Sequence, residues 1–363
     1  MSLVPPYVER LSPYVPGKPV EELERELGIK NAIKLASNES PLGPSPRALA
    51  AVREYASGAH RYPDAACWAL RTELAAHHGI DRGELVMGNG SNEIIDLVCR
   101  TFASPADHAI IGAPSFVCYH LGLTAANVPF DTVPLRDHLY WDVDAMLDRV
   151  RPETRLLFLA NPNNPTGTYV GRAALEKLLT ELPPWVLAVV DEAYVQFADA
   201  PDYVSALELR GTHERLMVLR TFSKAYGLAA LRVGYAIAPA SIVGYLDRTR
   251  APFNVNALAQ VAARAALEDP EHVARYVELN RKERARLTAA LEELGLTVAP
   301  SQANFVLVDF ARPGHEVYER LLRMGVIVRP MPPPIDSWLR ITVGLPEEND
   351  RLLACVRELL AGP

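Results

Sequence analysis

The sequence predicts an α/β protein: a large domain with a doubly wound, mostly parallel sheet, followed by a smaller α+β domain. Continuous apolar runs in the middle of the chain are typical of strands that are buried on both faces of a sheet. These runs are residues 156–160, 186–190, 216–219 and 233–238. Helical patterns separate the runs, and this alternation indicates a largely parallel sheet. After about residue 250 the pattern changes to two helices, the second of them long, and then to short strands, which predicts a second domain.

Residues 1–32 are expected to form an N-terminal arm that joins the smaller domain. Its prolines rule out a continuous helix, and only residues 20–27 have a helical pattern. A disordered tail is the alternative, but apolar side chains between the prolines favour an arm that docks on the body of the protein. The prolines are Pro5, Pro6, Pro13, Pro16 and Pro19.

The large domain is expected to span residues 33–250, with helices placed by apolar residues that recur every three or four positions. Before the four apolar runs, its expected elements are strand 33–35, helix 47–56 with Leu49, Val52 and Ala56 on one face, helix 69–78, strand 84–87, a helix with Ile94, Val98 and Phe102 on one face, and strands 109–112 and 130–133.

The smaller domain is expected to span residues 251–363 and to close the chain with a helix. Its two leading helices have apolar positions at helical spacing, and its strands are short. The expected elements are helices 257–267 and 273–294, strand 304–309, helix 316–324, strands 326–329 and 338–343, and helix 351–360.

Composition narrows the class of protein. The chain has 363 residues, of which 49% are hydrophobic and 22% charged, as in soluble globular proteins. A net charge of −7 without a basic block argues against nucleic acid or an anionic membrane surface as a partner. The N-terminus has no apolar core of signal-peptide length, and the four cysteines are scattered, which together favour a reduced cytoplasm. No cluster of cysteine and histidine has the spacing of a metal site.

The strongest candidate for chemistry is a lysine that follows a buried strand. Lys224 comes just after the run 216–219, with Thr221 and Ser223 before it and Arg232 after it. An amine at the rim of a core can form a Schiff base with an aldehyde. The two hydroxyls and the guanidinium can bind a phosphate attached to that aldehyde. A solvated lysine in a turn is the alternative, and it is the commoner outcome for an isolated Ser-Lys pair.

A glycine turn at residues 88–93 joins a strand to a helix. Backbone N–H groups at a helix N-terminus attract anions, so Ser91 and Asn92 are candidate phosphate donors. Ordinary capping of the helix by the same two residues is the alternative. Glu93 occupies the position after Asn92, so the turn does not have the glycine pattern of a dinucleotide site.

Two buried strands are followed by polar side chains. Asn164 lies in the turn after the run 156–160, where it can reach the crevice in which α/β proteins bind ligands. Asp191 ends the next run, and a carboxylate there needs a cationic partner, such as a protonated pyridine nitrogen. Tyr194 can aim its phenol at the same ring. A turn without a role, a helix cap and a core tyrosine are the respective alternatives.

Two arginines lie among apolar residues in the expected strands of the smaller domain. These are Arg329 and Arg340. A guanidinium is rarely buried without a partner, so the pair suggests a site for anions. A structural salt bridge is the alternative, and for Arg329 the two are about equally supported.

Several of these segments resemble the fold-type I, pyridoxal-phosphate-dependent aminotransferases over nearly the whole chain. The motifs are S-K-A-Y-G-L-A-A-L-R-V-G at 223–234, N-P-N-N-P-T-G at 161–167 and D-E-A-Y at 191–194. Within that family, the motifs at 13–19, 35–46, 61–64, 88–93 and 339–350 are similar to those of histidinol-phosphate aminotransferases. The resemblance implies the fold of these enzymes and pyridoxal 5′-phosphate as the cofactor.

The resemblance also implies a role for each matching residue. Lys224 matches the Schiff-base lysine, Asp191 the partner of the pyridine nitrogen, and Tyr194 and Asn164 the donors to the phenolic oxygen. Phe116 matches the stacked aromatic. Tyr62 matches a tyrosine that reaches the neighbouring subunit's cofactor, which implies a homodimer. The phosphate cup would be Ser91, Asn92, Thr221, Ser223 and Arg232, and the substrate side Tyr14, Asn38, Arg329 and Arg340.

Three positions depart from the family's pattern. Ser40 stands where a second asparagine is usual, Asn92 replaces a common aspartate, and Phe116 replaces a common tyrosine. The first two affect details of the loops. The third removes a phenol but keeps an aromatic face for the cofactor ring.

The implied reaction is transamination between L-histidinol phosphate and 2-oxoglutarate, which gives imidazole acetol phosphate and L-glutamate. An aromatic-amino-acid aminotransferase and a threonine-phosphate decarboxylase on the same scaffold are alternatives, because the side-chain pocket has no readable signature. A regulator that binds the cofactor without turnover is a further alternative, but every catalytic position is filled and no DNA-binding segment is attached.

Overall fold

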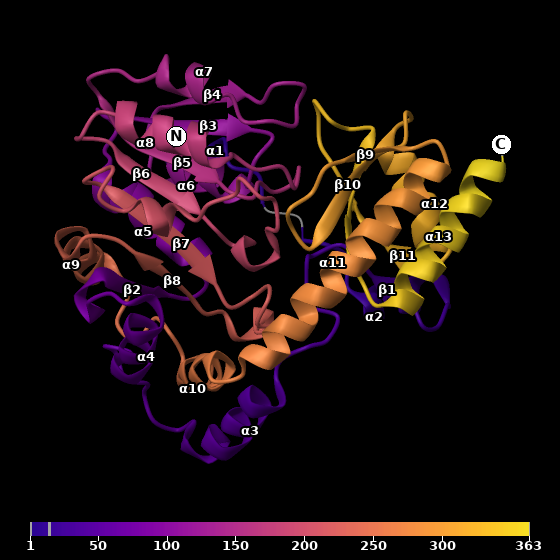
Figure 1. Ribbon diagram of the computed structural model, residues 1–363, viewed down its shortest axis with the longest axis horizontal. Helices are drawn as coiled ribbons and strands as arrows, with labels where there is room; N and C mark the ends of the chain where they lie inside the picture. The colour runs from indigo at the N-terminus through magenta and orange to yellow at the C-terminus, as the bar shows by residue number, and fades with distance from the viewer. Residues whose placement is uncertain (1, 14–15, 363) are drawn as a thin grey trace.

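The computed structural model describes residues 2–13 and 16–362 of the chain. These residues form a large lobe around one sheet and a smaller lobe around another (Figure 1). The long orange helix α11 (Pro270–Glu293) runs between the two lobes. None of the helices in the described residues combines the length and the apolar character that crossing a membrane requires.

Seven strands of the described residues form the sheet of the large lobe, in the order β2-β8-β7-β6-β5-β3-β4. β8 runs antiparallel to both of its neighbours, and the other pairs are parallel. The predicted doubly wound, mostly parallel sheet is therefore confirmed. The strands are β2 (Leu85–Gly88), β3 (His108–Ala113), β4 (Phe130–Pro134), β5 (Thr154–Ala160), β6 (Leu187–Asp191), β7 (Leu216–Thr221) and β8 (Gly234–Ile237).

Helices cover both faces of this sheet, because side chains along a strand point alternately to the two sides. Leu85 and Met87 of β2 pack in one core cluster with α4 (Trp68–His78) and α10 (Ala257–Leu267). Val86 packs in another cluster with α5 (Ser91–Phe102) and α9 (Ala240–Thr249). The remaining helices of the large lobe are α3 (Pro46–Tyr55), α6 (Val117–Ala125), α7 (Val143–Leu147) and α8 (Arg172–Glu181).

The predicted helices at 20–27 and 257–267 have those bounds in α2 (Val20–Leu27) and α10. The predicted apolar face of α3 is wrong at two of its three positions, since only Val52 packs against the core. Leu49 and Ala56 are exposed, and Ala48 is buried instead, because α3 turns Ala48 towards α10. The arm also contains one unpredicted turn of helix, α1 (Pro6–Glu9).

The smaller lobe is built on an antiparallel sheet in the order β12-β13-β10-β9, with α12 (Gly314–Arg323) and α13 (Pro346–Ala361) packed in its core. The strand predicted at 326–329 is wrong as a single element. Its first half pairs with β1, and its second half pairs with β13. The strands are β1 (Ile33–Lys34), β9 (Thr297–Ala299), β10 (Phe305–Asp309), β11 (Val326–Ile327), β12 (Arg329–Pro330) and β13 (Trp338–Thr342).

The division of the chain at residues 32/33 and 250/251 stays a prediction, and two contacts favour a different division. β1 pairs with β11 of the smaller lobe, and α10 belongs to the core of the large one. α11 then joins the lobes: its Tyr276 packs with Tyr194, whereas its Leu287 lies in the core of the smaller lobe. We therefore propose that the smaller domain begins within α11 and also includes β1.

Candidate active site

A cavity of about 580 Å³ lies where the carboxyl ends of the parallel strands face the smaller lobe. Two predicted site residues are not among those that line this cavity. Tyr62 lies away from it and is 81% exposed, and Tyr14 belongs to the residues that the structure does not describe. The arm reaches the cavity wall at Gly17. The predicted site residues that line the cavity are Asn38, Ser91, Asn92, Phe116, Asn164, Asp191, Tyr194, Thr221, Ser223, Lys224, Arg232, Arg329 and Arg340.

Lys224 projects into the cavity from the turn that follows β7. Its Nζ donates a hydrogen bond to the carbonyl oxygen of Ser37 at 3.2 Å and lies 5.8 Å from the centroid of the Tyr194 ring. Burial and, to a smaller extent, the positive charge of Arg340 together lower the pKa of the Lys224 amine to about 8. A neutral amine is a nucleophile, so this lysine is suited to attack an aldehyde near neutral pH.

Asp191 ends β6 and is buried beneath the cavity, with 4% of its surface exposed. Its Oδ2 accepts a hydrogen bond from the Tyr119 hydroxyl at 2.9 Å, and its Oδ1 accepts one from the backbone N–H of Ala193 at 3.1 Å. Burial raises the pKa of Asp191 to about 6, and these two donors oppose the rise. A cationic ring nitrogen beside Asp191 would lower that pKa again, so the acid suits a pyridinium partner.

An anion cradle lies at the N-terminus of α5. Arg232 Nη1 approaches Ser223 Oγ at 3.5 Å, and Thr221 Oγ1 donates to the same Ser223 oxygen at 3.0 Å. Gly90 caps α5 at φ +75°, and a Cβ there would lie 2.5 Å from Arg232 Nη2. Glycine at this position therefore lets the guanidinium lie beside the helix N-terminus, where backbone N–H groups add positive potential. The cradle fits the phosphate of a cofactor.

The two predicted anion-binding arginines come from adjacent strands of the smaller lobe, and Arg329 pairs directly opposite Arg340. Arg340 Nη1 donates to Asn164 Oδ1 at 2.5 Å, and its Nη2 donates to the carbonyl oxygen of Ala36 at 2.7 Å. Its guanidinium carbon lies 5.5 Å from the centroid of the Phe305 ring. These contacts hold Arg340 at the wall of the cavity that Lys224 also lines, with two of its nitrogens directed by Asn164 and Ala36.

Sequence reasoning missed Tyr119 and the polar residues around Asn38. Tyr119 lies three residues after Phe116 on α6, so helical spacing from Phe116 was the one available signal. Thr342, Asn304 and Asn38 are joined by hydrogen bonds although they lie far apart in the chain. No local motif indicates such a network.

Residues 30–356 match the family model described as aminotransferase class I and II. The chain belongs to this family. It is a pyridoxal-phosphate-dependent aminotransferase. The cradle, the buried carboxyl of Asp191 and the amine of Lys224 line one cavity, and their chemistry fits this cofactor.

Several members of the family resemble this aminotransferase over its full length. It is 48% identical to a histidinol-phosphate aminotransferase of Anaeromyxobacter sp. (strain Fw109-5), over 99% of this chain and 100% of the relative. It is 46% identical to histidinol-phosphate aminotransferase 2 of Pseudomonas aeruginosa, over 99% of this chain and 98% of the relative. The crystal structure of histidinol-phosphate aminotransferase from Sinorhizobium meliloti, in complex with pyridoxal-5′-phosphate, superposes with a TM-score of 0.90 at 28% identity, covering 99% of this chain and 98% of that one.

Proposed function

We propose that this aminotransferase transfers the amino group of L-histidinol phosphate to 2-oxoglutarate, giving imidazole acetol phosphate and L-glutamate. The observation that carries the proposal is its 48% identity, over the full length of both chains, to a relative named for that substrate. The arginine pair supports it, because Arg329 and Arg340 line the same cavity as Lys224. A planar guanidinium binds a phosphate monoester and a carboxylate equally well, and the two substrates carry these groups.

Different residues of the cavity would hold different parts of the cofactor. When bound, the cofactor supplies an electron-withdrawing pyridinium ring. Asp191 would keep the ring nitrogen protonated, because its buried carboxylate is stabilised by a positive charge beside it. Phe116 would stack on the ring, and Tyr194 and Asn164 would donate to its phenolic oxygen. The phosphate would occupy the cradle of Ser91, Asn92, Thr221, Ser223 and Arg232.

Lys224 would carry the proton of the reaction. With the cofactor bound, the Lys224 Nζ would accept the proton from the substrate Cα and donate it again, and the cofactor would supply the electron-withdrawing ring. The lowered pKa suits both steps, because an amine with a pKa of about 8 exchanges protons readily near neutral pH. Arg340 would orient the substrate's acidic group, since its position is already set by Asn164 and Ala36.

A substrate panel tests this function. With 2-oxoglutarate as acceptor, we expect kcat/KM for histidinol phosphate to exceed that for phenylalanine by about 100-fold or more, because buried polar donors reject a substrate that leaves them unpaired. Glutamate formation and CO2 release are measured together, and histidinol without its phosphate is the matched control. Equal or faster turnover of phenylalanine would identify an aromatic aminotransferase. Release of CO2 from threonine phosphate would identify a decarboxylase. The lack of any half-reaction with glutamate would indicate a regulator that binds the cofactor without turnover.

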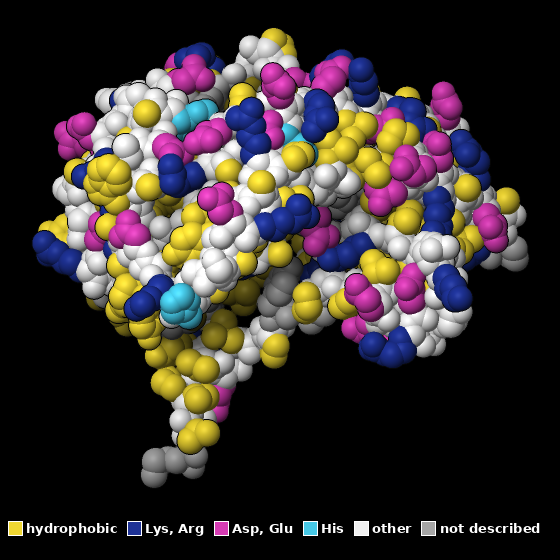
Figure 2. All heavy atoms as spheres, turned by 90° about the horizontal axis from the view of Figure 1, so that it is seen from below, with side chains coloured by type: hydrophobic (Ala, Val, Ile, Leu, Met, Phe, Trp, Pro, Cys, Tyr) yellow, Lys and Arg dark blue, Asp and Glu magenta, His cyan; other side chains and the backbone are white. Residues whose placement is uncertain are grey.

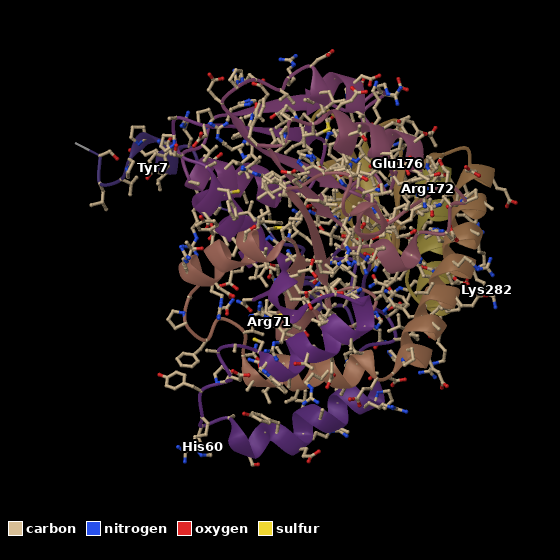
Figure 3. The ribbon with its side chains drawn as sticks, turned by 60° about the vertical axis from the view of Figure 1, so that its left-hand side comes forward. Tyr7, His60, Arg71, Arg172, Glu176 and Lys282 are labelled. Atoms are coloured by element: carbon tan, nitrogen blue, oxygen red, sulfur yellow. The ribbon has the colours of Figure 1, made fainter. Side chains whose placement is uncertain are left out.

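We also propose a homodimer in which Tyr62 reaches the partner's cofactor. Tyr62 lies away from the cavity of its own chain and stacks on Phe253, with ring centroids 4.7 Å apart. The N-terminal segment that carries Tyr7 projects from the body (Figure 3), and hydrophobic side chains cover most of the projecting segment (Figure 2). Leu3 on this segment is 99% exposed. A partner subunit would cover such surface.

Sedimentation measures the assembly directly. We expect a particle of about twice the 39.9 kDa chain mass, and a Tyr62→Phe variant that remains dimeric but binds the cofactor less tightly, because it lacks one phosphate donor. A monomer with full activity would contradict the proposal.

We also propose a cytoplasmic location. A reducing compartment such as the cytoplasm is supported by the four free thiols, which are Cys67, Cys99, Cys118 and Cys355. Fractionation of the native cell would test that location.

A further inference from the structure

Asn38 lies between the cofactor side and the smaller lobe, and 1% of its surface is exposed. Its backbone has φ +54°, in the left-handed region that asparagine tolerates better than most residues. Its Nδ2 is 2.9 Å from the hydroxyl of Tyr194, and its Oδ1 is 3.2 Å from the hydroxyl of Thr342 on β13. The side chain therefore bridges a residue of the cofactor site to a strand of the smaller lobe.

The hydrogen bonds of Thr342 match the orientation in which the NH2 end of the Asn38 amide faces Tyr194. The backbone N–H of Asn38 donates to Thr342 Oγ1 at 2.9 Å. Since Thr342 Oγ1 accepts this bond, its own proton is available for Asn38 Oδ1. With Thr342 donating to the oxygen of the amide, the NH2 group faces Tyr194 and donates to its hydroxyl.

An amide NH2 can only donate, so the Tyr194 oxygen accepts from Asn38 and cannot direct its own proton back along that bond. We propose that Asn38 is a positioning residue that, held by Thr342, turns the hydroxyl proton of Tyr194 towards the phenolic oxygen of the cofactor. The inference goes beyond the proposed substrate and rests on the proposed role of Tyr194 as a donor to that oxygen.

Two further contacts hold the bridge in place. Asn304 Nδ2 donates to the backbone oxygen of Asn38 at 3.1 Å and to the Tyr276 hydroxyl at 2.9 Å. The backbone N–H of Thr342 donates to the carbonyl oxygen of Leu35 at 2.8 Å. Asn38 is thus fixed at its backbone and at both ends of its side chain, so its amide is oriented before any ligand arrives.

The test is a pH titration of the visible absorbance of the cofactor bound to Lys224. A donor to the phenolic oxygen takes up part of its negative charge, which otherwise retains the proton on the Lys224 nitrogen, so this donor lowers the pH midpoint. We expect Tyr194→Phe to raise the midpoint by about one unit or more, and Asn38→Gly to raise it by about half a unit. Glycine is the matched choice because it accepts the positive φ at position 38.

Variants of Thr342 provide the second part of the test. Thr342→Val removes the hydroxyl while keeping the shape, frees the Asn38 amide to turn over, and should raise the midpoint as Asn38→Gly does. Thr342→Ser keeps the hydroxyl and should restore the original midpoint. In the Tyr194→Phe background, Asn38→Gly should cause no further shift, because the two changes act through one hydroxyl. The melting temperature of each cofactor-free variant records any general loss of stability.

The outcomes separate the two ideas. An unchanged midpoint in Tyr194→Phe would overturn the role of Tyr194 and the inference with it. A shifted midpoint in Tyr194→Phe together with an unchanged one in Asn38→Gly would overturn the inference alone. An Asn38→Gly shift of equal size in the Tyr194→Phe background would also overturn it, since Asn38 would then act by another route. None of these measurements depends on which amino donor the enzyme prefers.

Discussion

Replacing Lys224 by alanine is expected to reduce transamination by at least about 10⁴-fold and to remove the visible absorbance of the bound cofactor. The amine has two tasks in the proposed mechanism, covalent attachment of the cofactor and transfer of the Cα proton, and alanine performs neither. The cradle around Arg232 remains intact in this variant, so the cofactor should still bind, without a covalent bond. Assays of glutamate formation measure the first effect, and absorbance spectra of the purified variant measure the second.

The matched control is Lys177→Ala. Lys177 is an exposed lysine on α8 whose Nζ pairs with Asp144 at 2.5 Å, and it is not among the residues that line the cavity. Its loss should leave turnover and spectrum within about twofold, because a surface ion pair contributes little. Retained transamination in Lys224→Ala would remove the catalytic assignment of this lysine.

The pH dependence of cofactor uptake gives a second view of Lys224. Burial lowers its pKa to about 8, so about one in ten amines is neutral at pH 7, against fewer than about one in a thousand for an ordinary lysine. Only the neutral amine attacks an aldehyde, so the rate of covalent uptake by the cofactor-free protein should rise with pH up to about 8 and level off above it. A rate that still rises tenfold per unit above pH 9 would show an unperturbed lysine.

Asp191→Ala is expected to keep the covalent bond to Lys224 but to slow turnover by about 10³-fold. Without a carboxylate beneath the ring, the pyridine nitrogen loses its proton, and the ring withdraws charge from the substrate Cα far less strongly. Asp191 is 4% exposed, so water cannot replace the carboxylate as it would at the surface. The half-reaction with glutamate, followed by absorbance, should show the loss in the rate of Cα proton removal, with an increased isotope effect when that proton is deuterium.

Two variants bracket this prediction. Asp191→Glu retains the charge and should recover part of the rate. Tyr119→Phe removes one donor to Asp191 and should raise the pKa of the carboxyl further, so that activity is lost at the acidic end of the pH profile while the rate above pH 7 falls less than about tenfold. An Asp191→Ala enzyme with an unchanged rate of Cα deprotonation would contradict the ion pair with the ring nitrogen.

The parts of the site that follow buried strands were predictable from sequence. Asp191 and Lys224 come at or just after the carboxyl ends of β6 and β7, which are parallel neighbours, so the two chain positions meet at one edge of the sheet. Both features are local: an apolar run that stops at a polar residue, and the order of the strands. The resemblance of the motifs then supplied the cofactor, which the family match now establishes.

What sequence could not supply depends on contacts between distant segments. The bond from Asn38 to Thr342 joins residues 304 positions apart, and neither flanking segment indicates the other. The split of β11 from β12 has the same origin, because the first pairs with β1 and the second with β13. The inner face of α3 also depended on a distant element: α10 contacts Ala48, although apolar spacing alone favoured Leu49. Tertiary packing decided each of these cases.

The helix α11 connects the two lobes as one rigid element. It is continuous over 24 residues, which is about 36 Å of stiff rod. Its first half packs beside Tyr194 through Tyr276, and its second half lies in the core of the smaller lobe through Leu287. For a rod of this length, a tilt of about 5° displaces one end by about 3 Å relative to the other. We expect any change in the angle between the two lobes to leave α11 intact, because both of its halves are packed in a core.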